Sequence, residues 1–374
     1  MNERYIILIV AALLFMASCR RDVGIVSPTS TQVVSPGQGY NASDFYLLNE
    51  GNMGSNQASL DYYDNNAGTY TGNIYPTRNP SVTLGLGDVG NDIEIYGNKL
   101  YVVVNNSNKV EVLDKYSAKK LGQIDIRNCR NAAFYGGKIY ITSYDGFVGV
   151  TDTAFNFNES GEVQLQQQIV VGRQPEHLTV VANKLYVANS GGYSAPLYDS
   201  TVSVIDLTTN KEIKKIKVGI NLNDIQPDNS GNLWVSSRGN YTTVLSSLYV
   251  VDTKMDSVIK HLPISVGGFR IFNNKVYLYS VSYNLSNGVN TQVSYAVIDA
   301  NSKEITDTSF IKDGTENEII FPYMIAIDSV SENIYVSDAK DYVTPGTLYC
   351  FSKNGNLIWK VMTGNIPGHI AFYQ

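Results

Sequence analysis

Cysteine, histidine and long apolar runs are all scarce in this chain of 374 residues, and each scarcity removes a class of protein. The chain has three cysteines and three histidines. Only Cys129 and Cys350 follow Cys19, which is too few for a disulfide framework or a cysteine zinc site. Beyond the N-terminal segment, no stretch is long and apolar enough to predict a helix that crosses a membrane.

Basic patches and short catalytic motifs are missing as well. The net charge is −6 and no basic stripe runs along the chain, so we do not expect a nucleic-acid partner. The sequence contains no His-Glu-x-x-His, Cys-x-x-Cys-His, Gly-x-Ser-x-Gly or Walker motif. No nucleophile, base and orienting group can be assembled from what remains. The sequence therefore does not predict an enzyme or a bound cofactor.

The N-terminus reads as a processing signal followed by a linker. Arg4 precedes an apolar run of thirteen residues, Tyr5 to Ala17, which is the length of a signal-peptide core. The run ends in Met-Ala-Ser before Cys19, a pattern that resembles a bacterial lipobox. We therefore predict a signal peptide over 1–18 and a lipidated Cys19 that anchors the protein. An ordinary secretory signal is the alternative. Ser, Thr, Pro and Gly dominate 19–43, which predicts a flexible tether.

A short strand pattern repeats along the rest of the chain. Each copy has a turn, then Lys or Asn, an apolar residue, an aromatic residue and Val, Ile or Leu, as in KLYVVV from Lys99 and NIYVSD from Asn333. The shared aromatic residues are Tyr46, Tyr101, Tyr140, Tyr186, Trp234, Tyr277 and Tyr335. Their mean spacing of about 48 residues is typical of a propeller blade. β-branched residues, broken by Asn, Gly and Asp turns, indicate strands throughout.

The order of the strands within the repeats predicts how the fold closes. Six copies are preceded by a short apolar strand, but the first copy, DFYLLN from Asp44, is not. The missing strand stands at the end of the chain, as GHIAFY from Gly368. We therefore predict an all-β, seven-bladed β-propeller over 44–374, closed by pairing of the C-terminal strand with the N-terminal blade. A solenoid or two sandwiches would not explain this unpaired strand.

Loop length predicts that one face of the propeller is used for binding. The turns between the first and second strands are minimal, whereas the segments from Ala188, Ser236, Ser280 and Ser337 between second and third strands are long. These segments are rich in Tyr, Asn and Ser, which supply adaptable recognition surfaces. The candidate loop residues are Tyr193, Tyr198, Tyr241, Tyr283 and Tyr342.

Polar residues at the start of the innermost strands are expected to surround the mouth of the central channel on the same face. They are Asn91, Asp92, Asn131, Glu176, His177, Asn223, Asp224, Tyr323 and His369. Further candidates lie at the ends of second strands or in connectors, namely Asn49, Glu50, Tyr144, Arg173, Asn189 and Arg238. Such a mouth fits a ligand with many amides or hydroxyls. The same residues also suit a water-filled channel. His177 and His369 fall in blades that are not neighbours, so we do not expect them to share a metal.

Two stretches carry a family resemblance. Residues 175–190, PEHLTVVANKLYVANS, and 200–211, STVSVIDLTTNK, resemble the repeats of YncE/YVTN surface-layer-like propellers. With the lipobox, the chain is similar to outer-membrane lipoproteins of Bacteroidetes, including the BtuG type. That resemblance implies a cell-surface lipoprotein that binds vitamin B12 or another cobamide and passes it to a TonB-dependent transporter. The alternatives are a metal-dependent propeller hydrolase or lactonase, with a cation among Glu50, Asp92, Glu176 and Asp224, and a scaffold for protein or glycan partners.

Overall fold

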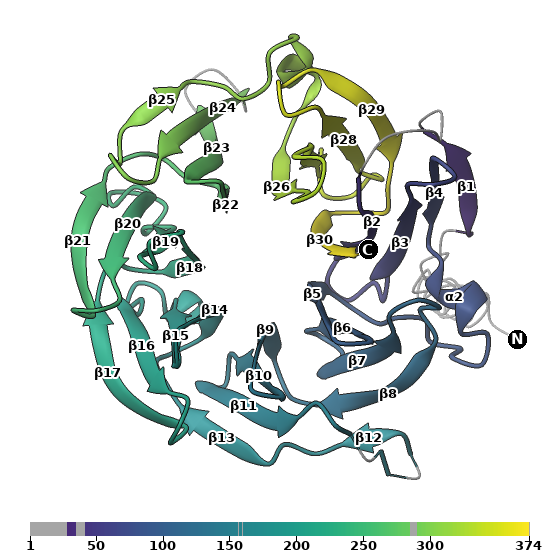
Figure 1. Ribbon diagram of the computed structural model, residues 1–374, viewed down its shortest axis with the longest axis horizontal. Coiled ribbons are helices and arrows are strands. Elements are labelled where there is room, and N and C mark those ends of the chain that lie inside the picture. The colour runs from purple at the N-terminus through teal and green to yellow at the C-terminus, as the bar shows by residue number, and fades with distance from the viewer. Residues whose placement is uncertain (1–27, 35–41, 156, 159, 285–289, 374) are drawn as a thin grey trace, which may run out of the picture.

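The computed structural model of the chain describes residues 28–34, 42–155, 157–158, 160–284 and 290–373. The predicted signal peptide and the lipidation site at Cys19 lie outside these residues. Seven sheets, antiparallel apart from one added edge strand, stand around a central axis, as Figure 1 shows. The predicted seven-bladed β-propeller is confirmed. No helix among the described residues is long and apolar enough to span a membrane.

Blade 1 closes the ring with strands from both ends of the chain. It contains β2 (Asp44–Asn49), β3 (Ser59–Asp64), β4 (Thr69–Gly72) and β30 (Pro367–Tyr373). The C-terminal strand β30 runs antiparallel to β2, with Tyr373 opposite Asp44 and His369 opposite Leu48. This pairing gives β2 its inner neighbour and removes the open edges that an unclosed ring would expose.

Blades 2 to 4 follow the same plan from the channel outward. Blade 2 contains β5 (Gly90–Tyr96), β6 (Lys99–Val104), β7 (Lys109–Asp114) and β8 (Lys120–Asp125), with β12 (Glu162–Val163) added to β8. Blade 3 contains β9 (Cys129–Tyr135), β10 (Lys138–Ser143), β11 (Phe147–Asp152) and β13 (Gln167–Val170). Blade 4 contains β14 (Pro175–Val181), β15 (Lys184–Asn189), β16 (Thr201–Asp206) and β17 (Lys211–Lys217).

Blades 5 to 7 complete the ring. Blade 5 contains β18 (Leu222–Pro227), β19 (Leu233–Ser237), β20 (Ser247–Asp252) and β21 (Ser257–Leu262). Blade 6 contains β22 (Gly268–Phe272), β23 (Lys275–Asn284), β24 (Asn290–Asp299) and β25 (Ile305–Asp307). Blade 7 contains β26 (Pro322–Ile327), β27 (Ile334–Asp338), β28 (Thr347–Phe351) and β29 (Leu357–Met362). The short helices are α2 (Tyr75–Arg78), η1 (Gly192–Ser194) and η2 (Thr315–Glu318).

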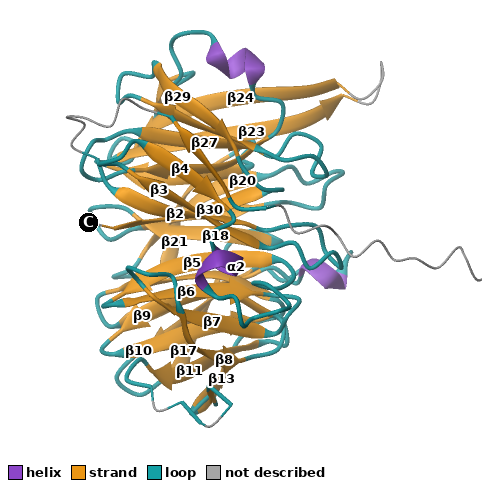
Figure 2. Ribbon diagram, turned by 90° about the vertical axis from the view of Figure 1, so that its right-hand side faces the viewer, coloured by secondary structure: helices purple, strands orange, loops and turns teal. Residues whose placement is uncertain are grey.

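Two segments differ from the sequence-based prediction. Within the predicted tether, β1 (Ser30–Val33) pairs with β4 and becomes the outermost strand of blade 1. The segment from Ser280, predicted to be a long loop, instead continues β23 and β24, which pair as two strands of ten residues each. In Figure 2, β23 and β24 project past the ends of the strands in the other blades. Alternation of Tyr, Val and Ser along the segment supports strand pairing, which the loop-length argument overlooked.

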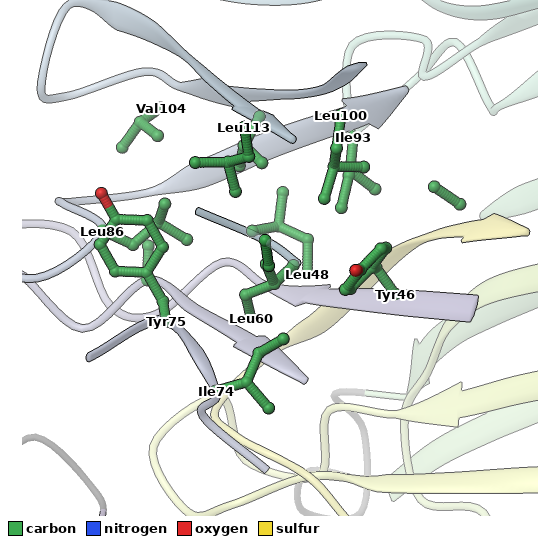
Figure 3. Packing of buried hydrophobic residues seen from close by; sticks show 14 residues of the cluster. Tyr46, Leu48, Leu60, Ile74, Tyr75, Leu86, Ile93, Leu100, Val104 and Leu113 are labelled. Atoms are coloured by element: carbon green, nitrogen blue, oxygen red, sulfur yellow. The ribbon is translucent and has the colours of Figure 1, made fainter. Parts of the chain in front are cut away.

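The core consists of apolar side chains packed between neighbouring blades. Figure 3 shows one such contact, in which Tyr46 and Leu48 of blade 1 meet Ile93 and Leu100 of blade 2. Six of the seven repeated aromatic residues are fully buried; Tyr277 is half-buried. Three of the buried tyrosine hydroxyls donate to a turn of the next blade: Tyr46 to Lys115, Tyr140 to Asn210 and Tyr186 to Asp256. The repeated aromatic residue therefore fills the interface and ties it together.

Candidate functional site

The central channel opens into a polar mouth on the face that carries the long loops. The cavity has a volume of about 1900 Å³ and is lined by the inner strands of all seven blades. In six blades the pairing between the two innermost strands shifts register near this mouth. Such irregularities re-aim side chains at the end of a strand. They occur where Asn91, Arg130, Glu176, Asn223 and Tyr323 reach the cavity.

The best-defined cluster at the mouth is built around Glu176, whose side chain is 1% exposed. Arg130 Nε donates to Glu176 Oε2 over 2.9 Å, and Arg238 Nη1 donates to Oε1 over 2.8 Å. The Tyr144 hydroxyl also donates to Oε1. We call these four residues the Glu176 clamp. It joins blades 3, 4 and 5.

Charge and stacking keep the clamp rigid. The Arg130 guanidinium lies 4.5 Å from the centre of the Tyr144 ring and donates to Asn91 of blade 2. Burial raises the pKa of Glu176, but the two arginines outweigh it and hold the pKa at about 2. The carboxylate is therefore ionised at neutral pH, and together with two guanidinium groups it leaves one net positive charge on this wall.

The opposite wall of the mouth is acidic and aromatic. The Tyr323 hydroxyl donates to Glu50 Oε2 over 3.0 Å, and His369 Nε2 lies 3.7 Å from Glu50 Oε1. Burial lowers the pKa of His369, yet the adjacent Glu50 carboxylate and the charge of Asp92 raise it overall. The Tyr342 ring meets the Tyr323 ring edge-on at 5.7 Å. This wall joins blades 1 and 7.

A third group links blades 3, 4 and 5 on the same side as the Glu176 clamp. His177 Nδ1 lies 3.3 Å from Asp224 Oδ1, and the other Asp224 oxygen accepts from Gln226 over 2.7 Å. Asn131 Nδ2 lies 3.5 Å from His177 Nε2. The Asn131 side-chain oxygen is buried and has no hydrogen-bond partner among the described residues.

Below the polar mouth, residues of two kinds alternate along the inner strands. Ile93, Leu178 and Ile225 are buried between the blades, whereas Glu94, Gln226 and Arg270 remain accessible from the channel. Deeper still, Glu94 lies inside the channel, where partial removal from bulk water and the charge of Asp92 raise its pKa against the opposing charge of Arg270.

Most of the residues predicted from the sequence line this cavity. They are Glu50, Asn91, Asp92, Asn131, Glu176, His177, Asn223, Asp224, Arg238, Tyr241, Tyr323, Tyr342 and His369. Their convergence follows from the shared position at the start of an inner strand or in the loop that precedes the third strand.

The other predicted residues do not line the cavity itself. Asn49 and Asn189 are fully buried at the ends of second strands and present no surface to a ligand. Tyr144 and Tyr193 form an edge-to-face pair at 5.0 Å beside the cavity. Arg173 is exposed on the rim, 4.0 Å from Asp199. Tyr198 is half-buried in the loop of blade 4. The backbone of Tyr283 belongs to β23, and its side chain lies outside the described residues.

Sequence reasoning missed Arg130, Gln226 and Arg270, all of which line the cavity. Arg130 precedes Asn131 in its inner strand as Glu176 precedes His177 in blade 4, and alignment of the repeats would have revealed it. Among the described residues, no group of three His, Cys, Asp or Glu side chains is arranged to hold a metal ion. The cation suggested among Glu50, Asp92, Glu176 and Asp224 therefore has no ligand set in this part of the chain.

The comparisons with known proteins agree with the fold. The family described as "Domain of unknown function (DUF5074)" matches residues 43–369. No curated protein sequence matches the chain. The structure is similar to hydrazine synthase from Kuenenia stuttgartiensis, with 15% identity and a TM-score of 0.60 over 74% of this chain and 88% of that one.

It is also similar to a quinoprotein alcohol dehydrogenase-like protein from Bacteroides thetaiotaomicron. Here the identity is 15% and the TM-score 0.57, over 90% of this chain and 79% of that one. The WD40 domain of Neurospora crassa Pan2 gives 8% identity and a TM-score of 0.51 over 72% and 78% of the two chains. At such identities the likeness shows the fold alone.

Proposed function

This chain belongs to the DUF5074 family, and we propose that it binds a polar small molecule at the mouth of its channel. The observation that carries the proposal is the convergence of hydrogen-bonding side chains from six inner strands on one cavity of about 1900 Å³. Concave sites of this kind combine apolar walls with a few well-placed polar groups.

The ligand that best fits this surface has many amides or hydroxyls around a larger apolar body. Asn91, Asn131 and Asn223 offer amides, and Tyr323 and Tyr342 offer rings at the mouth. Tyr241 is 71% exposed above them, where a ring can cover a flat ligand. A cobamide has such chemistry, since side-chain amides surround its corrin ring. The resemblance to BtuG-type lipoproteins makes vitamin B12 the first candidate.

The cellular role that we propose follows the same resemblance. The chain would be held at the outer membrane, on the cell surface, by lipid on Cys19. It would capture the ligand from outside and pass it to a TonB-dependent transporter. Binding of this kind needs no covalent step, because every interaction described at the mouth is a hydrogen bond, an ion pair or an aromatic contact.

Calorimetric titration of the purified full chain in detergent with cyanocobalamin tests the proposal. We expect saturable binding of one molecule per chain. Dicyanocobinamide, which lacks the nucleotide, serves as a second ligand and shows which part of the molecule is recognised. A flat titration with both at micromolar protein would contradict the assignment to cobamides. A polar nutrient of another class would then have to be sought by thermal-shift screening.

A further inference from the structure

The position of β1 fixes where the N-terminal segment leaves the propeller. β1 pairs antiparallel with β4 so that Ser30 lies opposite Gly72 and Val33 opposite Thr69. The Gly72 end of β4 is the mouth end, because the chain continues from there through α2 to β5, which begins at the mouth. Thr29 donates to the backbone of Asn73 at the same end. The segment that leads back to Cys19 therefore departs at the rim of the mouth face.

The length of that segment limits how the disc can sit. From Cys19 to Ser30 the chain can span at most about 40 Å when fully extended. An inner strand such as β5 has seven residues, so the disc is about 23 Å thick before its turns are counted. If the membrane lies below the mouth face, the segment from Ser30 to Cys19 reaches it directly. If the membrane lies below the opposite face, more than half of the length of this segment is needed to pass the edge of the disc.

Exposed apolar side chains are concentrated on that same mouth face. Met53, Leu84, Leu197, Leu245, Ile320 and Val343 lie in loops on this face and are between 56% and 77% exposed. They come from blades 1, 4, 5 and 7 and from two connectors, and we call them the apolar collar. The turns of the opposite face carry two large apolar side chains of comparable exposure, Tyr116 and Met255. Apolar loop tips gathered mainly on one face mark a surface that contacts something apolar.

We propose that the mouth face lies against the lipid surface, with the apolar collar in contact with the bilayer interface. Lipid on one cysteine holds the protein at a single point and leaves its orientation free, so an apolar contact elsewhere on the propeller would fix which face meets the membrane. The inference rests on the proposed lipid anchor and deepens the proposed function. It places the bound ligand between the propeller and the membrane, where a membrane protein can receive it.

The collar leaves one side open. The loops of blades 2 and 3 that would complete it are short, Asn105 to Asn108 and Tyr144 to Gly146, and contain no exposed aliphatic side chain. A ligand could reach the mouth from this side while the other blades rest on the lipid.

Blade 5 offers a matched pair of positions for a test. Leu245 precedes β20 on the mouth face, Met255 follows it on the opposite face, and both are exposed. Single Leu245→Cys and Met255→Cys variants of the lipidated protein would carry a polarity-sensitive fluorophore. Cys129 and Cys350 are buried, so labelling should be selective. Each variant is reconstituted into phosphatidylcholine vesicles that contain brominated lipid as quencher.

We expect the label at 245 to lose most of its fluorescence to the quencher and to shift to the blue, while the label at 255 does neither. Quenching at 255 instead, or at neither position, would overturn the proposal. Shielding at 245 in native membranes but not in these vesicles would also overturn it, because the occupant would then be a membrane protein. Calorimetry with cyanocobalamin in detergent does not depend on orientation, so a failure there affects the proposed function alone.

Discussion

Substitution of Glu176 by Gln tests the clamp most sharply, because it removes one charge while keeping the shape of the side chain. Arg130 and Arg238 would then face each other across a neutral amide in a buried site. The depressed pKa of about 2, against an ordinary 4.5, corresponds to about 3 kcal/mol in favour of the ionised form. Removal of one partner of a buried ion pair typically lowers the free energy of unfolding by about 3–5 kcal/mol.

We expect the lower end of that range, since the Arg238 side chain is 33% exposed and can turn toward water. For a domain of this size about 3 kcal/mol should lower the melting temperature by roughly 4 °C. The matched control is Glu304→Gln, because Glu304 is 72% exposed and lies 3.9 Å from Lys260. Surface pairs of this kind contribute about 0–1 kcal/mol, so the control should melt like the parent protein.

The pH dependence of the same variant provides an independent check. The folded-state pKa of Glu176 is lowered, so its stabilisation is fully present above the unfolded value of about 4.5 and is lost as pH falls toward about 2. Differential scanning fluorimetry between these limits should show the gap between Glu176→Gln and the parent closing on acidification. Equal melting of both glutamine variants, or a gap that does not change with pH, would refute the reasoning.

Three further outcomes follow from the structure. Deletion of 367–374 removes β30 and exposes the edge of β2. The truncated chain should lose its cooperative melting transition and aggregate in size-exclusion chromatography. An intact monomer would show that the ring does not depend on this strand. The pKa of His369 is raised in the folded state, so its pairing with Glu50 stabilises the fold below the ordinary pKa of about 6.5. This stabilisation is lost as pH rises through the folded-state pKa. The parent protein should therefore be more stable than His369→Gln at acidic pH, and the difference should shrink toward alkaline pH. Burial raises the pKa of Cys129 to about 12 and that of Cys350 as well, so neither thiol should react with Ellman's reagent until the protein is unfolded.

The fold could be predicted from the sequence because each blade repeats the same local signal. The aromatic residue of the second strand, from Tyr46 to Tyr335, recurs with turn residues on either side, and the solitary strand at Gly368 indicated how the ring closes. β1 could not be predicted, because its four residues, STQV, acquire strand structure only by pairing with the free edge of β4.

The site was predictable in position but not in its interactions. The start of each inner strand marks the mouth, so Glu176 and Asp224 were found from the repeat alone. That Arg130 of blade 3 reaches Glu176 of blade 4 depends on the angle between blades and on the irregular pairing at the mouth, which a single sequence does not show. Asn49 and Asn189 occupy similar positions in sequence, yet lie inside the blades.

The measurement that tests the central claim most directly is cyanocobalamin binding by a matched pair of tyrosine variants. Tyr241 on the mouth face and Tyr116 on the opposite face are 71% and 63% exposed, so replacing either by Ala should leave the fold equally intact. The account predicts that Tyr241→Ala weakens binding about tenfold, or about 1.4 kcal/mol, while Tyr116→Ala binds like the parent chain. Unchanged binding by Tyr241→Ala together with loss in Tyr116→Ala would place the ligand on the other face and contradict it.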